Sequence, residues 1–158
     1  MPEYRVGTGF DAHALEEGMP LVLGGMPFRS PRGLAGHSDG DVIAHALIDA
    51  IVGPVGLGDI GTLFPSDDAS LEGVSSLKLL ADAYADVRRL GWKLVNADMV
   101  FIGNEPRIGP VRHEMERILS STLGGDGVVS VRATTTDGLG FTGRGEGLAA
   151  QAVALLVR

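Results

Sequence analysis

The chain has 158 residues, of which 44% are hydrophobic, and this suits one domain of roughly 100–200 residues with a filled core. Its 13 basic and 20 acidic residues give a formal net charge of −7, which argues against nucleic acid or an anionic membrane surface as partner. The absence of cysteine excludes disulfides and thiolate chemistry, so any transition metal must be bound by His, Asp or Glu.

The first 40 residues predict two strands and a polar loop. Residues 4–10 and 20–28 have the apolar and β-branched composition of short strands, and Gly24-Gly25 inside the second suits a hairpin turn. A polar, glycine-rich loop is expected over 29–40. The first six residues lack the features of a signal peptide, and no apolar run approaches the ~20 residues of a membrane span, so we expect a soluble cytoplasmic protein.

A helix over about 39–52 is expected next. Ser38 and Asp41 fit a capping box, in which Ser38 accepts from the first-turn amides and Asp41 lies at the positive end of the helix. Residues 53–74 contain five glycines and two prolines, which predicts an irregular loop. A loop of that length suggests a function.

The second half of the chain predicts three further helices and two strands. Amphipathic spacing indicates helices, the first capped by Ser75 or Ser76, and alternation indicates strands. The expected elements are helix 75–90, strand 92–102, helix 110–122, strand 128–135, loop 136–145 and a largely buried last helix 146–157. This order predicts an α+β fold, one domain over 1–158, with helices on one face of a small mixed four-stranded sheet.

Two histidines and a carboxylate form a candidate metal site. Asp11 and His13 are two residues apart on a strand and point to the same side, and His45 lies one turn into the following helix. With the fourth position open, this is the ligand set of a catalytic zinc ion. Asp49 or Asp41, each one turn from His45, could hold its second ring nitrogen. The spacing also leaves open that Asp11 caps a turn and that both histidines are structural.

Two loops are candidate phosphate sites. Residues 37–40 precede a helix N-terminus, and residues 134–146 combine hydroxyls, glycine amides, a carboxylate and an arginine, which together suit a diphosphate and a second hard cation. The alternatives are simple helix capping for the first loop, and for the second a glycine-rich turn with a structural pair between Arg144 and Glu146. Asp59 in the long loop could accept from substrate hydroxyls.

Four stretches in order together resemble the 2-C-methyl-D-erythritol 2,4-cyclodiphosphate synthase family. They are GTGFDAHAL (7–15), LAGHSDGDVIAHALIDA (34–50), LGDIGTLFP (57–65) and ATTTDGLGFTGRGEG (133–147). The resemblance implies a homotrimer of small α+β subunits with active sites at subunit boundaries. It also implies that the 2-phosphate of 4-diphosphocytidyl-2-C-methyl-D-erythritol 2-phosphate attacks the β-phosphorus and that CMP leaves.

The resemblance further implies roles for individual residues. Asp11, His13 and His45 would bind zinc, and Asp137 a second divalent cation, magnesium or manganese. The residues implied in catalysis are His37, Ser38, Asp59, Thr135 and Asp137. Those implied in substrate binding are Asp11, His13, His37, Ser38, Asp59, Ile60, Gly61, Gly103, Pro106, Arg107, Ala133, Thr134, Thr135, Thr136, Asp137, Phe141 and Arg144. The neighbouring subunit would contribute Gly103, Pro106, Arg107, Ala133, Thr134 and Thr135.

Two other readings of the same residues stay open. A metal-dependent phosphatase would use the three ligands to activate water and would release inorganic phosphate. A non-catalytic trimeric nucleotide-binding module would keep the loops and perform no chemistry.

Overall fold

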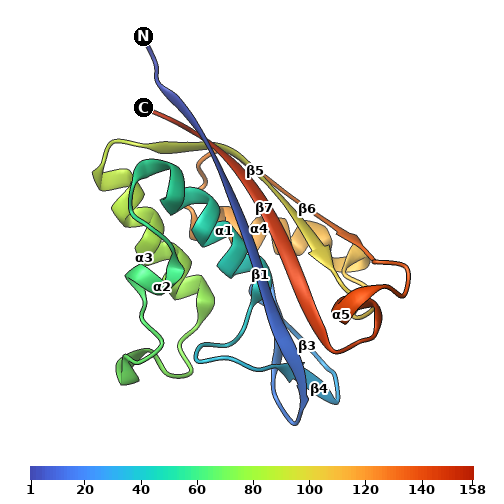
Figure 1. Ribbon diagram of the computed structural model, residues 1–158. Coiled ribbons are helices and arrows are strands. Elements are labelled where there is room, and N and C mark those ends of the chain that lie inside the picture. The colour runs from blue at the N-terminus through green and yellow to red at the C-terminus, as the bar shows by residue number, and fades with distance from the viewer.

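A five-stranded sheet in the order β4-β1-β7-β5-β6 forms the centre of the computed structural model, which describes residues 1–158 (Figure 1). All neighbouring strands are antiparallel except β5 and β6, which are parallel. The strands are β1 (Tyr4–Glu17), β4 (Arg32–Leu34), β5 (Lys93–Ile102), β6 (Val128–Thr134) and β7 (Gly147–Val157). A separate hairpin pairs β2 (Leu21–Leu23) with β3 (Met26–Phe28).

The three longer helices cover one face of this sheet (Figure 1). They are α1 (Val42–Val52), α3 (Ser76–Arg89) and α4 (Arg112–Thr122). The short helices are α2 (Ile60–Leu63) and α5 (Gly140–Gly143), and 3₁₀ turns span Gly53–Val55, Ala69–Leu71 and Gly109–Val111. One continuous core of 33 buried hydrophobic residues lies between helices and sheet. None of the helices has the length and apolar character needed to cross a membrane.

The last element is a strand, so the prediction of a helix over 146–157 is wrong. Its alanine-rich sequence favours a helix locally, but burial alternates along β7: Ala150, Ala152 and Ala154 are buried, whereas Gln151 and Val153 are exposed. Strand β7 pairs with β1 on one side and β5 on the other over almost its whole length. These long-range pairings outweigh the helix propensity of alanine, which is only a few tenths of a kcal/mol per residue.

The sheet therefore has five strands where four were expected, and β4 was also missed. Strand β1 extends to Glu17, well past the predicted residues 4–10, because β4 and β7 both pair with its second half. The hairpin at Gly24-Gly25 and the boundaries of α3, α4, β5 and β6 agree with prediction to within two residues. The two long loops contain short helices, which local periodicity over three or four residues cannot reveal.

Helix α1 packs directly on β1 because two glycines of the strand face it. A Cβ atom at Gly7 would come within 1.8 Å of the Ala50 carbonyl oxygen, and one at Gly9 within 1.9 Å of the Ala46 carbonyl oxygen. Any side chain at these positions would push the helix away. The close approach brings His45 of α1 beside the side chains that follow on the same face of β1.

The opposite face of the sheet is not covered by any element of the chain. Residues directly opposite one another in antiparallel strands share a face, as Val6 does with Leu155 and Thr8 with Val153. Tyr4, Val6 and Phe10 of β1 are 58%, 68% and 57% exposed on this face. The isolated chain thus leaves an apolar sheet surface in contact with water.

The two chain ends lie side by side at one corner of the sheet (Figure 1). The amides and carbonyls of Glu3 and Arg158 exchange two hydrogen bonds of 2.9 Å, and the side chains form an ion pair. The guanidinium groups of Arg5 and Arg158 each lie 4.7 Å from the centre of the buried Trp92 ring system. This arrangement closes the β1–β7 pairing at its outer end.

Asp41, not Ser38, is the N-cap of α1. Its Oδ1 accepts from the amides of Ile43 and Ala44 at 3.1 Å, and its carboxylate also accepts from the amides of Gly24 (2.9 Å) and Gly25 (2.8 Å) in the hairpin turn. The side chain is fully buried, and burial raises the pKa of Asp41 to about 6 although the amides lower it. One carboxylate therefore ties the hairpin to the start of the helix.

Replacing Asp41 by alanine is expected to lower the free energy of unfolding by about 3 kcal/mol. The change removes an N-cap, worth about 1 kcal/mol, and leaves buried amides without an acceptor, at about 1–3 kcal/mol each, offset in part by the relief of burying a charge. Urea unfolding at fixed protein concentration measures the loss. Asp82→Ala is the control: that side chain is half exposed and pairs only with Lys78, so a change within about 0.5 kcal/mol is expected. Equal effects would contradict the capping role.

Candidate functional site

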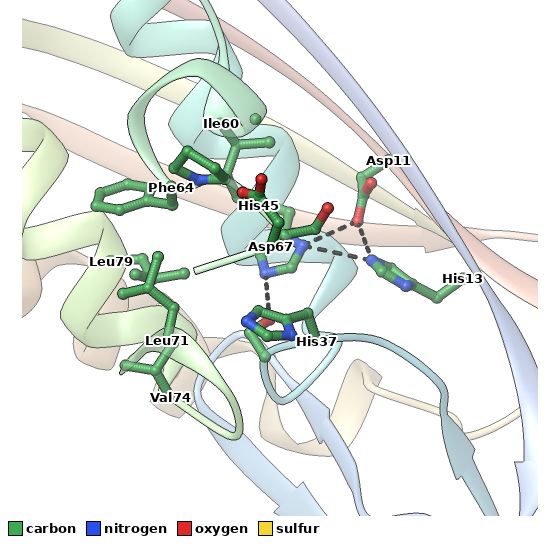
Figure 2. Close-up of a pocket in the computed structure, with 14 residues that line it drawn as sticks. Asp11, His13, His37, His45, Ile60, Phe64, Asp67, Leu71, Val74 and Leu79 are labelled. Atoms are coloured by element: carbon green, nitrogen blue, oxygen red, sulfur yellow. Dashed lines mark hydrogen bonds and ion pairs between the residues drawn. The ribbon is translucent and has the colours of Figure 1, made fainter. Parts of the chain in front are cut away.

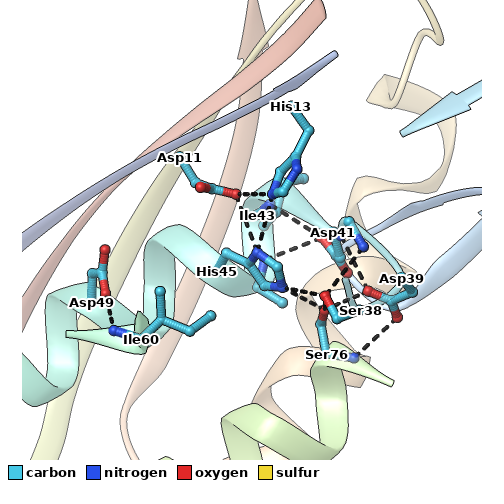
Figure 3. Close-up of polar contacts among 12 residues, drawn as sticks. Asp11, His13, Ser38, Asp39, Asp41, Ile43, His45, Asp49, Ile60 and Ser76 are labelled. Carbon is cyan, nitrogen blue, oxygen red and sulfur yellow. Dashed lines mark hydrogen bonds and ion pairs between the residues drawn. The ribbon is translucent and has the colours of Figure 1, made fainter. Parts of the chain in front are cut away.

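Asp11, His13 and His45 meet at one point between β1 and α1, as the sequence predicted. Oδ2 of Asp11 lies 2.9 Å from Nε2 of His13 and 3.2 Å from Nδ1 of His45, and the two nitrogens are 3.4 Å apart (Figure 3). The first two residues point to the same side of β1 because side chains two apart on a strand share a face. His45 reaches them because Gly7 and Gly9 let α1 approach the strand.

The three atoms fit a divalent metal ion. Oδ2 of Asp11 is buried and accepts no hydrogen bond, although it contacts both rings. Nδ1 of His13 lies 2.6 Å from the Ala35 carbonyl oxygen, which can only accept, so Nδ1 carries the ring proton and Nε2 presents a lone pair to the site. Two ligand atoms each ~2.0–2.2 Å from a tetrahedral ion lie about 3.4 Å apart, close to the distances found here. The chain therefore contains a candidate three-ligand metal centre.

The electrostatics of the centre also favour a cation. The contact with Asp11 raises the pKa of His13, against the burial of the ring. Burial raises the pKa of Asp11, but the two histidines outweigh it and hold that pKa below its usual range. The carboxylate is therefore ionised at neutral pH and offers a negative charge to whatever occupies the space between the rings.

A pocket of about 540 Å³ opens above the centre (Figure 2). Its polar end is formed by the three ligands with His37 and Ser38, and its apolar wall by Phe64, Leu71, Val74 and Leu79 of the segment that joins α1 to α3 and of α3 itself. The complete lining is Asp11, His13, His37, Ser38, His45, Ile60, Gly61, Phe64, Pro65, Ser66, Asp67, Leu71, Val74 and Leu79. The sequence missed most of the apolar wall because Phe64, Leu71 and Val74 fall in a segment without periodicity.

Asp59 lies beside the pocket as the N-cap of α2. Its Oδ1 accepts from the amide of Thr62 at 2.7 Å and from the Thr62 hydroxyl at 2.8 Å, and these bonds lower the pKa of Asp59. The carboxylate is exposed and adjoins Ile60 and Gly61, which line the pocket.

The polar loop that carries His37 and Ser38 is held against the segment before α3. The His37 carbonyl oxygen accepts from the amide of Gly73 at 2.7 Å, and Nε2 of His37 lies 2.8 Å from the Asp68 carbonyl oxygen. The amide of Asp39 donates to the Val74 carbonyl oxygen at 3.2 Å. Two segments about thirty residues apart thus form the mouth of the pocket together.

Neither Asp49 nor Asp41 holds the second nitrogen of His45, so that prediction is wrong. Oδ1 of Asp49 accepts from the amide of Ile60 at 2.8 Å, and Asp41 is occupied by the hairpin and helix amides. Nε2 of His45 faces two serine hydroxyls instead, Ser76 at 2.8 Å and Ser38 at 3.0 Å (Figure 3).

The remaining predicted residues form a second cluster, at the carboxyl ends of the parallel strands β5 and β6 and in the loop after β6. The amide of Gly103 joins the two strand ends by donating to the Thr134 carbonyl oxygen at 3.1 Å. These residues do not line the pocket of the same chain: Gly103, Pro106, Arg107, Ala133, Thr134, Thr135, Thr136, Asp137 and Arg144. Phe141, which was also predicted to bind substrate, lines a separate hollow together with His13.

Within this cluster the loop after β6 is held by side-chain contacts. The hydroxyls of Thr136 and Thr142 are 2.8 Å apart, and Arg144 forms an ion pair with Glu146 at 2.8 Å, the structural alternative that the sequence left open. Asp137 is exposed and has a φ of 57°, in the left-handed region that residues other than glycine rarely adopt.

Comparison with known proteins gives a consistent result. The family model described as YgbB family matches residues 4–157. A 2-C-methyl-D-erythritol 2,4-cyclodiphosphate synthase from Clostridium acetobutylicum is 47% identical over 97% of this chain and 99% of the relative. A solved structure of a 2C-methyl-D-erythritol-2,4-cyclodiphosphate synthase, in a form bound to CDP, is 39% identical with a TM-score of 0.86 and covers 96% of this chain and 99% of that one. The bifunctional IspDF from Campylobacter jejuni matches with a TM-score of 0.93 and 40% identity over 99% of this chain and 43% of that one.

Proposed function

The chain belongs to the YgbB family, and we propose that the pocket above Asp11, His13 and His45 is where it carries out the reaction of its synthase relatives. It converts 4-diphosphocytidyl-2-C-methyl-D-erythritol 2-phosphate to 2-C-methyl-D-erythritol 2,4-cyclodiphosphate and CMP, a step in isoprenoid precursor synthesis. One observation supports this location of the reaction. The buried Oδ2 of Asp11, which accepts no hydrogen bond, lies close to one ring nitrogen of His13 and one of His45.

The reaction needs positioning and charge neutralisation more than a protein nucleophile. An oxygen of the 2-phosphate attacks the β-phosphorus of the same molecule, and the bond from that phosphorus to the oxygen of the CMP leaving group breaks. Because the attacking phosphate and the β-phosphorus belong to one substrate molecule, the step is intramolecular. Part of the entropic cost of bringing the two groups together is therefore already met. No serine nucleophile is required: Ser38, His45 and Asp11 do lie in a row in the pocket, with Nε2 of His45 3.0 Å from the Ser38 hydroxyl and Nδ1 3.2 Å from Asp11, but the attacking oxygen belongs to the substrate.

Asp11, His13 and His45 would hold a zinc ion. Two imidazoles, one carboxylate and an open position are typical of catalytic zinc, and the absence of cysteine leaves no softer ligand. Bound there, the ion supplies Lewis acidity and offsets phosphate charge. His37 and Ser38 would offer hydrogen bonds to the phosphates, and Asp59, Ile60 and Gly61 would bind the methylerythritol hydroxyls; all but Asp59 line the pocket.

We propose that the functional unit is a homotrimer. The uncovered sheet face, with Tyr4, Val6 and Phe10 exposed, supplies an apolar surface suited to self-association. The second cluster of one subunit would complete the pocket of its neighbour and would bind the cytidine and its phosphates. Asp137, exposed and in a constrained backbone conformation, would bind a second divalent cation, magnesium or manganese, together with the diphosphate.

The single-domain organisation over residues 1–158 is proposed on the continuity of the core. A cytoplasmic location stays a prediction from the sequence.

Product analysis tests the proposed function against both other readings. Protein supplied with zinc, magnesium and the cytidyl substrate is expected to release CMP and the cyclic diphosphate in equal amounts, with no inorganic phosphate. Release of inorganic phosphate would favour the phosphatase, and nucleotide binding without any product would favour the binding module. Phosphorus NMR of the reaction mixture separates the three outcomes in one measurement.

Removal of metal is expected to abolish turnover and leave the trimer intact. The ligands lie on the face of the sheet that the helices cover, whereas the apolar part of the proposed subunit contact lies on the opposite face, so loss of the ion leaves that part in place. Chelation followed by rate measurement and light scattering on a sizing column checks both parts, and zinc is expected to restore the rate. Dissociation into monomers on chelation would contradict this placement of the metal and the interface.

A further inference from the structure

We propose that Ser76 is a positioning residue for the metal centre: its hydroxyl, held by Asp39, fixes His45 in the tautomer and orientation that leave Nδ1 free to bind the ion. The inference rests on the proposed metal centre. It concerns a residue that is outside the pocket and outside the ligand set.

Ser76 is the first residue of α3, and its side chain is completely buried. Its hydroxyl oxygen lies 2.8 Å from Nε2 of His45 and donates a hydrogen bond to Oδ1 of Asp39 (Figure 3). The amide of Ser76 donates to the other oxygen of the same carboxylate at 3.0 Å. Asp39, Ser76 and His45 therefore form a continuous chain of contacts that ends at the metal ligand.

The direction of these hydrogen bonds follows from the protons available. An ionised carboxylate only accepts, and Asp39 accepts from the amides of Asp41 and Ser76 as well as from the hydroxyl. The one hydroxyl proton of Ser76 points to Asp39, so its oxygen is left to accept from His45. Nε2 of His45 then carries the ring proton, and Nδ1 faces Asp11 with its lone pair.

Both metal-binding histidines are thus set by a partner on the far side of the ring. The Ala35 carbonyl oxygen does this for His13, and the hydroxyl of Ser76 does it for His45. Hydrogen bonds of this kind orient the ring and increase its basicity as a ligand. The partners of the two histidines differ in what they require. The carbonyl oxygen beside His13 can only accept, whereas the hydroxyl beside His45 accepts from the ring only when another group takes the hydroxyl proton. Asp39 supplies that acceptor.

Ser38 also approaches Nε2 of His45, at 3.0 Å, but it is placed differently. Ser38 lines the pocket and belongs to the loop proposed to contact the phosphates, so its hydroxyl can instead hydrogen-bond a substrate phosphate. Ser76 is anchored on a helix and does not itself line the pocket, although its hydroxyl lies 3.4 Å from that of Ser38. The ring therefore keeps one partner when Ser38 turns toward substrate.

The test compares zinc affinity and ring tautomer in Ser76→Ala and in the parent protein. We expect zinc affinity, measured by competition with a chromophoric chelator, to fall about 10- to 100-fold. Nitrogen NMR is recorded on metal-free protein with isotope-labelled histidine, at a pH at which the rings are neutral. We expect a single His45 tautomer, protonated at Nε2, in the parent and a mixture of the two tautomers in the variant. A role limited to holding α3 would not change the tautomer.

Two further variants complete the comparison. Ser75→Ala is the matched control, because Ser75 is exposed at the same helix start and its side chain makes no capping bond; parent-like affinity is expected. Asp39→Asn keeps the size of the carboxylate but can donate to Ser76, so it is expected to shift the tautomer as well. If Ser76→Ala does not fold, Asp39→Asn and Ser76→Cys provide the same two readouts.

The outcomes separate this inference from the proposed function. A parent protein that binds no zinc and makes no cyclic product would refute the metal centre itself. A parent that binds zinc and is active, with variants whose affinity stays within about twofold and whose tautomer is unchanged, would refute the role of Ser76 alone.

Discussion

Replacing His13 by alanine is expected to reduce turnover by about 1,000-fold or more. The change removes one of the three candidate metal ligands and leaves Asp11 and His45 with a position that water must fill. Losing about 4 kcal/mol of charge stabilisation in the transition state slows a reaction roughly 1,000-fold. Rates measured under saturating substrate, together with the metal content of the purified variant, check the expectation.

His113→Ala is the matched control for this substitution. The His113 ring is 80% exposed on α4 and contacts only Glu116, so neither the rate nor the metal content is expected to change. A His13 variant that binds cytidine diphosphate and retains the parent rate would remove the centre from the mechanism. A variant that loses metal but keeps its fold, as judged by circular dichroism, would support the assignment.

Replacing Gly9 by alanine is expected to destabilise the protein by more than about 3 kcal/mol and to lower its soluble yield. The added methyl group would meet the Ala46 carbonyl oxygen at 1.9 Å and the Ala50 amide nitrogen at 3.0 Å, and both belong to the backbone of α1. A backbone cannot rotate away as a flexible side chain can, so the whole helix must shift. That shift would also move His45 from its two co-ligands, so zinc affinity is expected to fall with stability.

Gly109→Ala tests whether the effect is due to the close contact. A Cβ atom there would meet nothing within 4 Å, and the backbone is not in the left-handed region. Its unfolding midpoint in urea is expected to stay near that of the parent. A Gly9 variant with parent stability would mean that α1 and β1 are less tightly packed than their glycines indicate.

The site was most predictable where its geometry is local. Asp11 and His13 share a face because they are two apart on a strand, and this follows from the alternation of any strand. The third ligand depends on the contact between α1 and β1, which spacing could not establish and which the resemblance to known sequences supplied. The loop over 134–146 in the second cluster was predicted from its residue types, and the rest of the cluster from the resemblance; the single chain does not bring the cluster to the pocket.

The prediction failed where contacts distant in sequence decide the outcome. The alanines of β7 favour a helix until β1 and β5 provide partners on both sides. Asp41 and Ser38 are both good N-cap residues in isolation. Asp41 is favoured in the structure because its carboxylate also accepts from the amides of Gly24 and Gly25, 17 and 16 residues earlier. Ser76 has no local feature that connects it with His45, thirty-one residues away, so only the three-dimensional structure reveals the contact.

The meeting of the chain ends at one corner has a consequence for protein architecture. The ends join at the outer limit of β1, and His13 lies nine residues further along the strand, which at ~3.3 Å per residue is about 30 Å away. A linker attached at that corner can therefore connect the chain to a second folded unit without crossing the proposed catalytic pocket. The solved chain of the bifunctional IspDF from Campylobacter jejuni, of which this chain matches 43%, is more than twice as long. A circular permutant, with the old ends bridged by a few flexible residues, would use the same corner.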